Sequence, residues 1–526
     1  MTTELKSAII KNDSCSNKNR HVLPCLIAIF VFVWICKIYS AATIELLAEE
    51  AYYWTYSQHP SLSYFDHPPM VAWVISLGTS IFGNCEFGVR FGSLLLSLGS
   101  LLLMFFYSRF WFGFTNACWS AMLFSILPIY IGTGFLAFPD GPLIFFWLLT
   151  IYLFSKAATT GKTSYWALVG VSFGAALLSK YSAIFLGVGA ILFLFGSRTH
   201  RYWLMRIEPW LSFVFAILVF SPVIDWNAQH GWVSFLFQAS RPATPSPESL
   251  RYVYEFLLFQ LGAVTPFILG LFVITAGYLV SRGWFWKKDH WNIAMAFFWP
   301  LFTLFLISAL TTKVHFNWTA PAYLSLLPGA VQYFRIFVRK HQQQSCWRPI
   351  ASIALFICGF SAVLMFSVLV LGEPKHLARG QVGGWRQLAV SVQHAEEELK
   401  AETGQTPFIL GVDKLYYAAE LGFYRGQPRN TVNWYALDQS GFGYTYWVDL
   451  RKYYGRPAVA VLSNRLALPV LKQYFNRLDI PSDIAIRFTG DKQRKFLVIK
   501  CFGYKGSITG LDRSYNSDAY SDKDSR

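Results

Sequence analysis

The chain has 526 residues, of which 54% are hydrophobic and only 14% are charged, and its formal net charge is +16. This composition excludes an ordinary soluble protein and indicates a membrane protein. The basic residues lie in short clusters between apolar runs and form no nucleic-acid motif, so the net charge does not predict a nucleic-acid partner.

Long apolar runs recur through the first two thirds of the chain, and runs of about 20 residues can cross a hydrocarbon core of roughly 30 Å. The sequence predicts eleven spans, near 22–41, 91–108, 115–134, 141–156, 164–179, 182–197, 210–224, 255–280, 291–309, 318–334 and 349–371. The run 69–83 is shorter and begins at a Pro-Pro pair, which favours a re-entrant or interfacial helix. We therefore expect an all-α polytopic membrane domain over residues 22–371, with about 11 to 13 transmembrane helices.

The distribution of charge predicts the orientation, because Lys and Arg collect in cytoplasmic loops. The segments on the side of the N-terminus, including the tail 1–21, hold seventeen Lys or Arg residues and three acids. The opposite loops hold five basic residues but eight acids: Glu45, Glu49, Glu50, Asp66, Glu86, Asp140, Asp225 and Glu248. We therefore expect a cytoplasmic N-terminus and a periplasmic first outer loop, residues 43–90.

An odd number of spans places the remainder of the chain on the outer side as well. The segments "FILGVDKLYYAAELGFYRG" and "RPAVAVLSN" predict a buried strand, a helix and a second strand, and "DKQRKFLVIKCFGY" predicts a closing strand. The sequence thus predicts a small periplasmic α/β domain over 372–505. The tail 506–526 is rich in Ser, Asp and Lys, which is typical of disorder.

The stretch "AEEAYYWTYSQHPSLSYFDHPPM" at 48–70 gathers three carboxylates between apolar segments. Glu49 and Glu50 are adjacent on an expected short helix and point about 100° apart, so at most one of them can face a common centre. Asp66 precedes the Pro-Pro pair, so it is either a functional group or the N-cap of the next helix.

A second outer loop also ends in an acid and a proline at the mouth of a helix. Asp140 in "FLAFPDGPLIFFW" is either a cap or a partner of the first carboxylates in one cavity. The scarce outward cations complement these acids, because a phosphate at the membrane surface needs positive charge. The candidates for phosphate binding are Lys180, Arg241, Lys313 and His315.

These stretches, together with "LLSKYSAIF", "SPVIDWNAQHGWVSFLFQASR" and "KVHFNWTAPAYLSL", resemble polyprenol-phosphate-dependent glycosyltransferases of the GT-C fold. The group is the protein O-mannosyltransferase-like family, and the nearest members are bacterial lipid A aminoarabinose and galacturonic acid transferases. The resemblance implies a cavity at the periplasmic membrane face, where a sugar passes from a polyprenyl-phosphate carrier to an acceptor.

The same resemblance assigns roles to the candidate residues. Glu49 occupies the position of the family's best candidate base, and the choice between Glu49 and Glu50 stays open. Asp140 falls on the second acidic position. The expected substrate-binding residues are Tyr53, Asp66, His67, Lys180, Arg241, Lys313 and His315. His67 replaces the Lys of the aminoarabinose enzymes, and it can hydrogen-bond a phosphate without a permanent charge.

We therefore expect a bacterial inner-membrane glycosyltransferase whose acceptor is lipid A, lipopolysaccharide or another envelope molecule. One alternative keeps the fold and transfers the sugar to Ser or Thr of a protein. An alternative of another class is a lipid-linked sugar transporter, which would place charges near the bilayer midplane and show repeated halves. A divalent metal could join the carboxylates, but the sequence defines no ligand set.

Overall fold

The computed structural model describes residues 22–240, 246–282, 288–340, 347–371, 383–412, 415–433, 442–487 and 493–506. The chain forms two compact units. The membrane unit comprises the residues up to Thr43, His67–Trp226 and Pro242–Val370, and the loop–sheet unit comprises the rest. The first outer loop is therefore divided between the units after Asp66. Most of the two predicted tails, at 1–21 and 507–526, lies outside the described residues.

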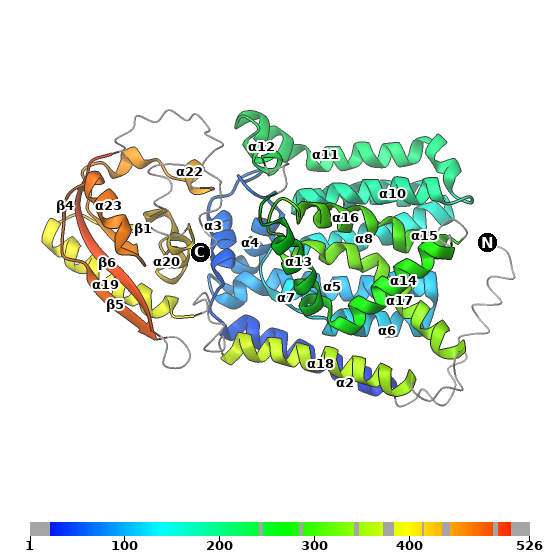
Figure 1. The fold of residues 1–526 in the computed structure, drawn as a ribbon. Coiled ribbons are helices and arrows are strands. Elements are labelled where there is room, and N and C mark those ends of the chain that lie inside the picture. The colour runs from blue at the N-terminus through cyan, green and yellow to red at the C-terminus, as the bar shows by residue number, and fades with distance from the viewer. Residues whose placement is uncertain are drawn as a thin grey trace. The chain divides into compact units, whose positions relative to one another are not determined.

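The membrane unit is built from helices that mostly share one direction (Figure 1). They are α2 (Val22–Thr43), α4 (Met70–Phe82), α5 (Glu86–Phe112), α6 (Phe114–Ile126), α7 (Pro128–Phe135), α8 (Asp140–Thr160), α9 (Thr163–Ser179), α10 (Phe185–Gly196), α11 (Ile207–Gln229), α13 (Ser249–Val264), α14 (Pro266–Arg282), α15 (Asp289–Ala296), α16 (Trp299–Ser308), α17 (Ala320–Lys340) and α18 (Trp347–Leu371). Short 3₁₀ turns are η2 (Tyr181–Ile184), η3 (Arg201–Met205) and η5 (Phe316–Thr319).

Every predicted apolar run coincides with one helix or with two helices in succession. Two of the runs are sharply bent. The run 115–134 bends by 69° between α6 and α7, and the run 255–280 bends by 108° between α13 and α14. The second bend follows from the backbone, because Thr265 has a φ of +67° and Pro266 has no N–H to continue the helix.

Four helices among the described residues are long and apolar enough to cross a membrane, and the number rises to seven if each bent pair is one span. The prediction of about eleven crossings therefore stays a prediction. The short run after the Pro-Pro pair forms α4, a helix of 13 residues, as the sequence indicates.

Glycines allow α4 to pack closely on the first half of α5. A Cβ on Gly78 would lie 2.1 Å from the Gly88 carbonyl oxygen, and a Cβ on Gly92 would lie 2.6 Å from the Val74 carbonyl oxygen. Both distances are far below van der Waals contact, so only glycine permits this approach of the two backbones. The packing holds α4, and with it the Pro-Pro turn that begins this helix, against α5.

The loop–sheet unit combines two short outer segments with the C-terminal domain. Its helices are α3 (Ala48–Gln58), α12 (Val233–Ala239), α19 (Trp385–Thr403), α20 (Leu415–Tyr424), α22 (Tyr444–Trp447) and α23 (Leu468–Tyr474), and its 3₁₀ turns are η6 (Pro428–Asn430), η7 (Leu450–Tyr453) and η8 (Arg465–Ala467). Helix α3 packs on α20, where the Trp54 ring meets the Phe423 ring edge-on at 5.0 Å between centroids. Helix α3 of the first outer loop is therefore part of the core of this unit.

The sheet has six strands: β1 (Phe408–Gly411), β2 (Thr431–Asn433), β3 (Ala458–Leu462), β4 (Phe475–Leu478), β5 (Ser482–Arg487) and β6 (Gln493–Tyr504). The order is β2-β1-β3-β6-β4, and β5 also pairs with β6. Strands β2, β1 and β3 are parallel, whereas β6 runs antiparallel to its three neighbours. The strand, helix and strand predicted at 408–462 and the closing strand are confirmed.

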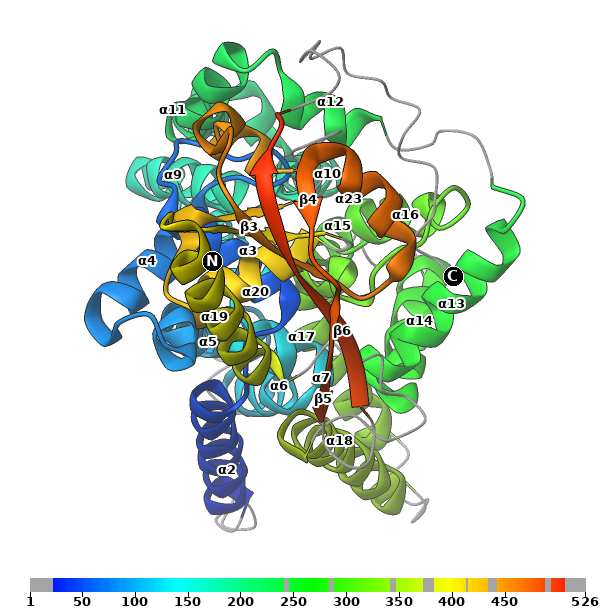
Figure 2. The same ribbon diagram turned by 90° about the vertical axis from the view of Figure 1, so that its left-hand side faces the viewer.

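Alternation along the strands gives the sheet two buried faces, because successive side chains point to opposite sides. Ile409, Val459 and Val461 pack with α19 and α20 on one face. Phe408, Leu410 and Ala460 pack with Leu471 of α23 on the other face. Figure 2 shows the long strand β6 crossing this domain beside β3, β4 and β5.

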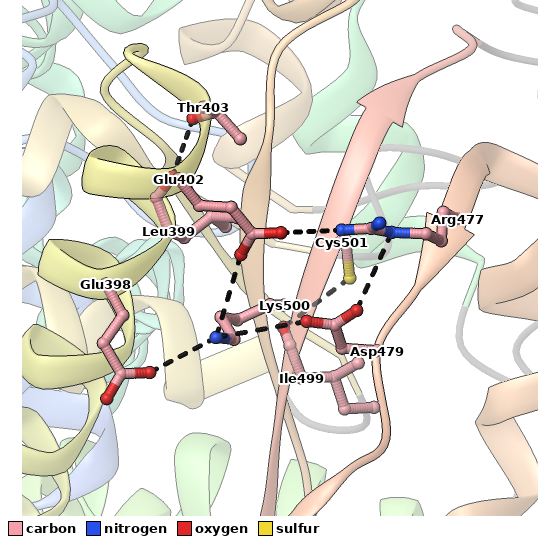
Figure 3. Close-up of polar contacts among 9 residues, drawn as sticks. All are labelled: Glu398, Leu399, Glu402, Thr403, Arg477, Asp479, Ile499, Lys500 and Cys501. Carbon is pink, nitrogen blue, oxygen red and sulfur yellow. Dashed lines mark hydrogen bonds and ion pairs between the residues drawn. The ribbon is translucent and has the colours of Figure 1, made fainter.

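Ion pairs on the sheet domain connect α19 to β6 and β4, and connect β6 to the turn after β4 (Figure 3). Lys500 lies 3.3 Å from Glu398 and 4.0 Å from both Glu402 and Asp479, measured from Nζ to carboxylate oxygen. Arg477 binds Glu402 at 2.9 Å. Because these groups are partly exposed, each pair stabilises the domain only weakly, by roughly 0–1 kcal/mol.

Candidate active site

Helix α3 presents its two glutamates in different ways. A carboxylate oxygen of Glu50 accepts a hydrogen bond from the Leu47 backbone N–H at 3.0 Å, which caps the first turn of the helix. Glu50 is fully buried, whereas Glu49 is exposed. The two glutamates therefore have different environments, and Glu49 is the accessible one. That only one of them faces a common centre stays a prediction.

The environment of Glu49 suits a group that accepts a proton. Partial loss of hydration raises the pKa of its carboxyl, a backbone hydrogen bond lowers it, and the negative charge of Glu50 raises it again. The net direction is upward, toward the range in which a carboxylate is a better base. The position of Glu49 in the first turn of α3 keeps the ionised form available, because the helix N-terminus favours negative charge.

Asp66 is buried against α3 rather than placed at a helix terminus. Its Oδ1 accepts a hydrogen bond from the Tyr52 hydroxyl at 3.1 Å and another from the Tyr56 hydroxyl. Helix α4 begins only at Met70, with Pro69 at its N-cap, so the alternative that Asp66 caps this helix is wrong. Burial raises the pKa of Asp66 to about 6, although the two tyrosine hydroxyls and a backbone N–H oppose the shift.

Tyr52 and Tyr56 hold the candidate residue Asp66, and the sequence did not single them out. They are four residues apart on α3 and so lie on the same face of the helix. Their spacing in "EEAYYWTYSQ" was the available signal. The predicted residue Tyr53 is buried beside them, and its ring meets the Tyr56 ring edge-on at 5.5 Å. Tyr53 therefore packs within the aromatic cluster.

Asp140 lies in the membrane unit at the start of α8, and both of its carboxylate oxygens are engaged. Lys180 Nζ donates to one oxygen at 2.9 Å, and Asn317 Nδ2 donates to the other at 2.9 Å. The side chain of Asp140 is 4% exposed and that of Lys180 is 14% exposed. The sequence predicted Asp140 and Lys180 as site residues, and the structure brings them together.

Asn317 was missed, although it lies two residues after the predicted His315. It is placed by the turn η5, which a buried amide holds in position. Gln260 Oε1 of α13 accepts hydrogen bonds from Thr319 Oγ1 and from the Tyr323 hydroxyl, each at 2.9 Å. Nothing in "KVHFNW" distinguishes the asparagine from an ordinary turn residue, so only tertiary contact reveals it.

The other predicted residues are placed as follows. Lys313 pairs with Glu255 at 3.5 Å and is therefore engaged with α13. His315 is exposed, with its ring 5.3 Å from that of Trp318. His67 is half-buried at the start of the membrane unit. Arg241 lies outside the described residues.

The candidate residues fall into two groups, one in each unit. Glu49, Glu50 and Asp66 belong to the loop–sheet unit, and Asp140 and Lys180 belong to the membrane unit. The expected convergence of both groups on one cavity stays a prediction. Among the described residues, no group of three or more His, Cys, Asp or Glu side chains could hold a metal ion.

Comparison with known proteins shows that this chain is similar to sugar transferases. Residues 66–226 match the family of dolichyl-phosphate-mannose-protein mannosyltransferases. The chain is 24% identical over 302 residues to the lipid A galacturonosyltransferase RgtD of Rhizobium johnstonii, which covers 57% of this chain and 63% of that protein. The resemblance predicted from the sequence is confirmed. Within this protein O-mannosyltransferase-like group, other relatives are named as glycosyltransferases too.

One of these is the undecaprenyl phosphate-α-4-amino-4-deoxy-L-arabinose arabinosyl transferase of Erwinia tasmaniensis. It is 30% identical over 133 residues, which cover 24% of this chain and 24% of that protein. The chain thus spans 63% of the galacturonosyltransferase and about a quarter of the arabinosyl transferase.

Solved structures show that an ArnT-like fold extends over almost the whole chain. ArnT of Cupriavidus metallidurans in the apo state has a TM-score of 0.63 and 16% identity, and the match covers 92% of this chain and 98% of that one. The same protein bound to undecaprenyl phosphate has a TM-score of 0.62 and 14% identity, over 91% and 98% of the two chains. Several helices of the described residues are long and apolar enough for a multi-pass membrane protein.

Proposed function

We propose that the protein is a glycosyltransferase that moves a sugar from a polyprenyl-phosphate donor to lipid A or another envelope acceptor at the periplasmic face. The observation that carries the proposal is the similarity over 302 residues to a lipid A galacturonosyltransferase. The fold of a protein that binds undecaprenyl phosphate supports the same class of donor.

The accessible carboxylate Glu49 is the proposed base or acceptor-positioning group. The bond between the anomeric carbon and the phosphate oxygen breaks, and the acceptor oxygen forms the new bond to that carbon. The proton of an acceptor hydroxyl passes to Glu49, while the carrier phosphate leaves with its negative charge and needs no proton. Glu50 is unsuited to this role because it is buried and caps α3.

Asp140 has a different proposed role, because both of its oxygens already accept hydrogen bonds. It orients the Lys180 ammonium and the Asn317 amide, which can then bind anionic oxygens of a substrate. The exposed His315 lies two residues before Asn317. His67, in the first outer loop, is the proposed phosphate partner. Substrate binding by Lys313 and Tyr53 has less support, because Lys313 is paired with Glu255 and Tyr53 packs in the aromatic cluster. Arg241 lies outside the described residues, so no contact supports its role.

The test uses membranes that contain the protein, a labelled undecaprenyl-phosphate-linked sugar and purified lipid A. Glu49→Gln is expected to lower the transfer rate by roughly 10²-fold or more, the usual effect of removing a general base. Glu50→Gln and Asp140→Asn are expected to retain more activity. Glu397→Gln on the exposed face of α19 is the matched control. Full activity in Glu49→Gln, Glu50→Gln and Asp140→Asn would remove the proposed mechanism.

A protein acceptor is the second candidate, since the matching family is named for transfer of mannose to proteins. Mass spectrometry of lipid A and of periplasmic proteins from a strain that lacks the gene separates the two acceptors. Loss of a sugar from lipid A supports the proposal, whereas loss from Ser or Thr of proteins supports the alternative. Movement of a lipid-linked sugar across the membrane of vesicles, without transfer of the sugar to an acceptor, would instead indicate the transporter.

A further inference from the structure

Asp66 lies where the chain passes from the loop–sheet unit into the membrane unit, and the next residues are His67, Pro68 and Pro69. Asp66 is only 8% exposed. Among the described residues, no cationic side chain forms an ion pair with its carboxylate. A buried carboxylate without a cation is costly unless hydrogen bonds hold it, so its partners carry information about its role.

Three separate segments of the loop–sheet unit hold Asp66. From α3, Tyr52 and Tyr56 both donate to its Oδ1. From α12, Gln238 Nε2 donates to the Asp66 backbone carbonyl at 3.0 Å. From the C-terminal domain, the Gly443 backbone N–H donates to the Tyr52 hydroxyl oxygen at 3.0 Å, which orients that hydroxyl toward Asp66. Both the side chain and the main chain of Asp66 are therefore fixed.

Aromatic packing reinforces the same arrangement. The Trp447 ring lies 6.1 Å from the Tyr52 ring and 5.4 Å from the Tyr56 ring. The Tyr64 ring stacks on the Tyr56 ring at 4.0 Å, and the Tyr64 hydroxyl donates to the Tyr56 carbonyl. The two hydroxyls that bind Asp66 thus come from rings that the C-terminal domain and the loop itself hold in place.

We propose that Asp66 is a positioning residue, which holds the residue directly before the His67–Pro68–Pro69 segment against the helix that carries Glu49. The geometry is direct, because Glu49, Tyr52 and Tyr56 belong to one helix and both tyrosines bind Asp66. The prolines restrict the backbone that follows, since each has a fixed φ and each restricts the residue before it. The C-terminal domain takes part through Gly443 and Trp447.

This role differs from the direct substrate contact that the sequence suggested. The Asp66 carboxylate is buried, two tyrosine hydroxyls hold its Oδ1, and its charge would repel a phosphate. The inference rests on the proposed function, in which His67 binds the phosphate of the donor. Loss of Asp66 should therefore weaken binding of the carrier lipid more than it slows the chemical step.

The experiment measures the affinity of the purified full-length protein for undecaprenyl phosphate, together with kcat and KM for the labelled donor. Asp66→Ala and the double variant Tyr52→Phe/Tyr56→Phe are expected to raise Kd and KM roughly tenfold, as expected for two lost hydrogen bonds. Asp66→Asn keeps an oxygen that accepts from both hydroxyls and should stay within about threefold of the unmodified protein.

Tyr453→Phe is the matched control, because it removes a buried hydroxyl of the same unit that donates only to the Arg429 carbonyl. It should change neither Kd nor KM. A purely structural role of Asp66 would lower the fraction of active protein, and so kcat, with Kd unchanged in the folded fraction.

Two results would overturn the inference while leaving the proposed function intact. One is an Asp66→Ala protein with unchanged Kd and KM. The other is an Asp66→Asn protein as impaired as Asp66→Ala, which would show that the charge itself is needed. Failure of the proposed function gives a different result, in which the unmodified protein neither binds undecaprenyl phosphate nor transfers sugar, and Glu49→Gln changes nothing.

Discussion

Glu49 and Glu50 are neighbours on α3, where their side chains point about 100° apart and reach different environments. Glu50 points into the protein and binds the backbone N–H that begins the helix, while Glu49 points to solvent. The same residue type therefore serves structure at one position and is available for chemistry at the next. Only the fold distinguishes them, since the sequence gives both the same carboxylate in the same loop.

The capping role of Glu50 can be measured directly. Glu50→Ala should lower the free energy of unfolding of the loop–sheet unit by about 1 kcal/mol or more, the usual effect of losing a helix-capping side chain. Glu50→Gln keeps an acceptor oxygen and should cost less. Thermal unfolding in detergent checks both variants, with Glu397→Ala as the exposed control. An unchanged melting temperature in Glu50→Ala would contradict the cap.

Asp66 makes stability depend on pH. Its pKa is raised to about 6 by burial, and the groups that face it are the hydroxyls of Tyr52 and Tyr56. The folded protein therefore holds a proton between about pH 4 and pH 6 that the unfolded chain has released. The free energy of unfolding should fall by up to about 3 kcal/mol as pH rises through this window, and then level off.

Chemical denaturation of the purified protein at a series of pH values measures this slope. Asp66→Asn should remove the part of the slope that lies between pH 4 and pH 6, because it has no group that titrates there. Stability that rises with pH in this window, or a slope that persists in Asp66→Asn, would count against the assignment.

Lys180 and Asp140 form a nearly buried ion pair, so removal of one partner should lower the free energy of unfolding. Lys180→Met leaves the Asp140 carboxylate with only the Asn317 amide, and we expect destabilisation of roughly 3–5 kcal/mol. The double variant Lys180→Met/Asp140→Asn removes both charges and should recover much of this loss. Denaturation of the two variants in detergent provides the comparison, and a double variant less stable than Lys180→Met would refute the pairing.

Among the elements, helix–helix contact is closest where α4 crosses α5. Gly92 faces the backbone of Val74, so a side chain at 92 must push the two helices apart. Gly92→Ala should destabilise the membrane unit by roughly 1–3 kcal/mol, as overpacking does elsewhere. Gly270→Ala is the control, since a Cβ at that helical position meets no other atom within 4 Å. Equal melting temperatures of the two variants would argue against this contact.

The positions of the elements could be predicted well from the sequence, because apolar run length alone locates helices in a membrane protein. The strand–helix–strand pattern of the C-terminal domain was equally visible in its alternation. The bend at Thr265 and the short strands β2, β4 and β5 were not predicted. The bend depends on a local φ value, β2 depends on pairing with β1, and β4 and β5 depend on pairing with β6; no periodic pattern records these features.

Only the charged residues of the candidate site could be identified from the sequence. Carboxylates and cations stand out in an apolar sequence, so Glu49, Asp140 and Lys180 were identified as candidates. Their neutral partners did not stand out: Tyr52 and Tyr56 are two tyrosines among 28, and Asn317 follows an ordinary turn. Such residues are recognised only when distant segments meet, as α3 meets the residue that precedes His67.

At the scale of the whole molecule, the first part of the first outer loop and the C-terminal domain belong to one compact unit. Residues 44–66 share a compact unit with the residues after 371. Glu45 shows the connection, since one of its carboxylate oxygens accepts from the Trp385 backbone N–H at 2.9 Å. Segments that are more than 300 residues apart in sequence must therefore reach the same side of the membrane before this unit can fold.

This requirement predicts the topology together with the charge distribution of the loops. If the first outer loop is periplasmic, the C-terminal domain must be periplasmic too. Alkaline phosphatase fused to the end of the chain should be active, because it forms its disulfides only in the oxidising periplasm. The same reporter fused after Lys340, in a loop rich in basic residues, should be inactive, and a fluorescent cytoplasmic reporter there should give signal. The reverse pattern would place both the loop and the sheet domain in the cytoplasm, where a periplasmic transfer reaction could not use Glu49.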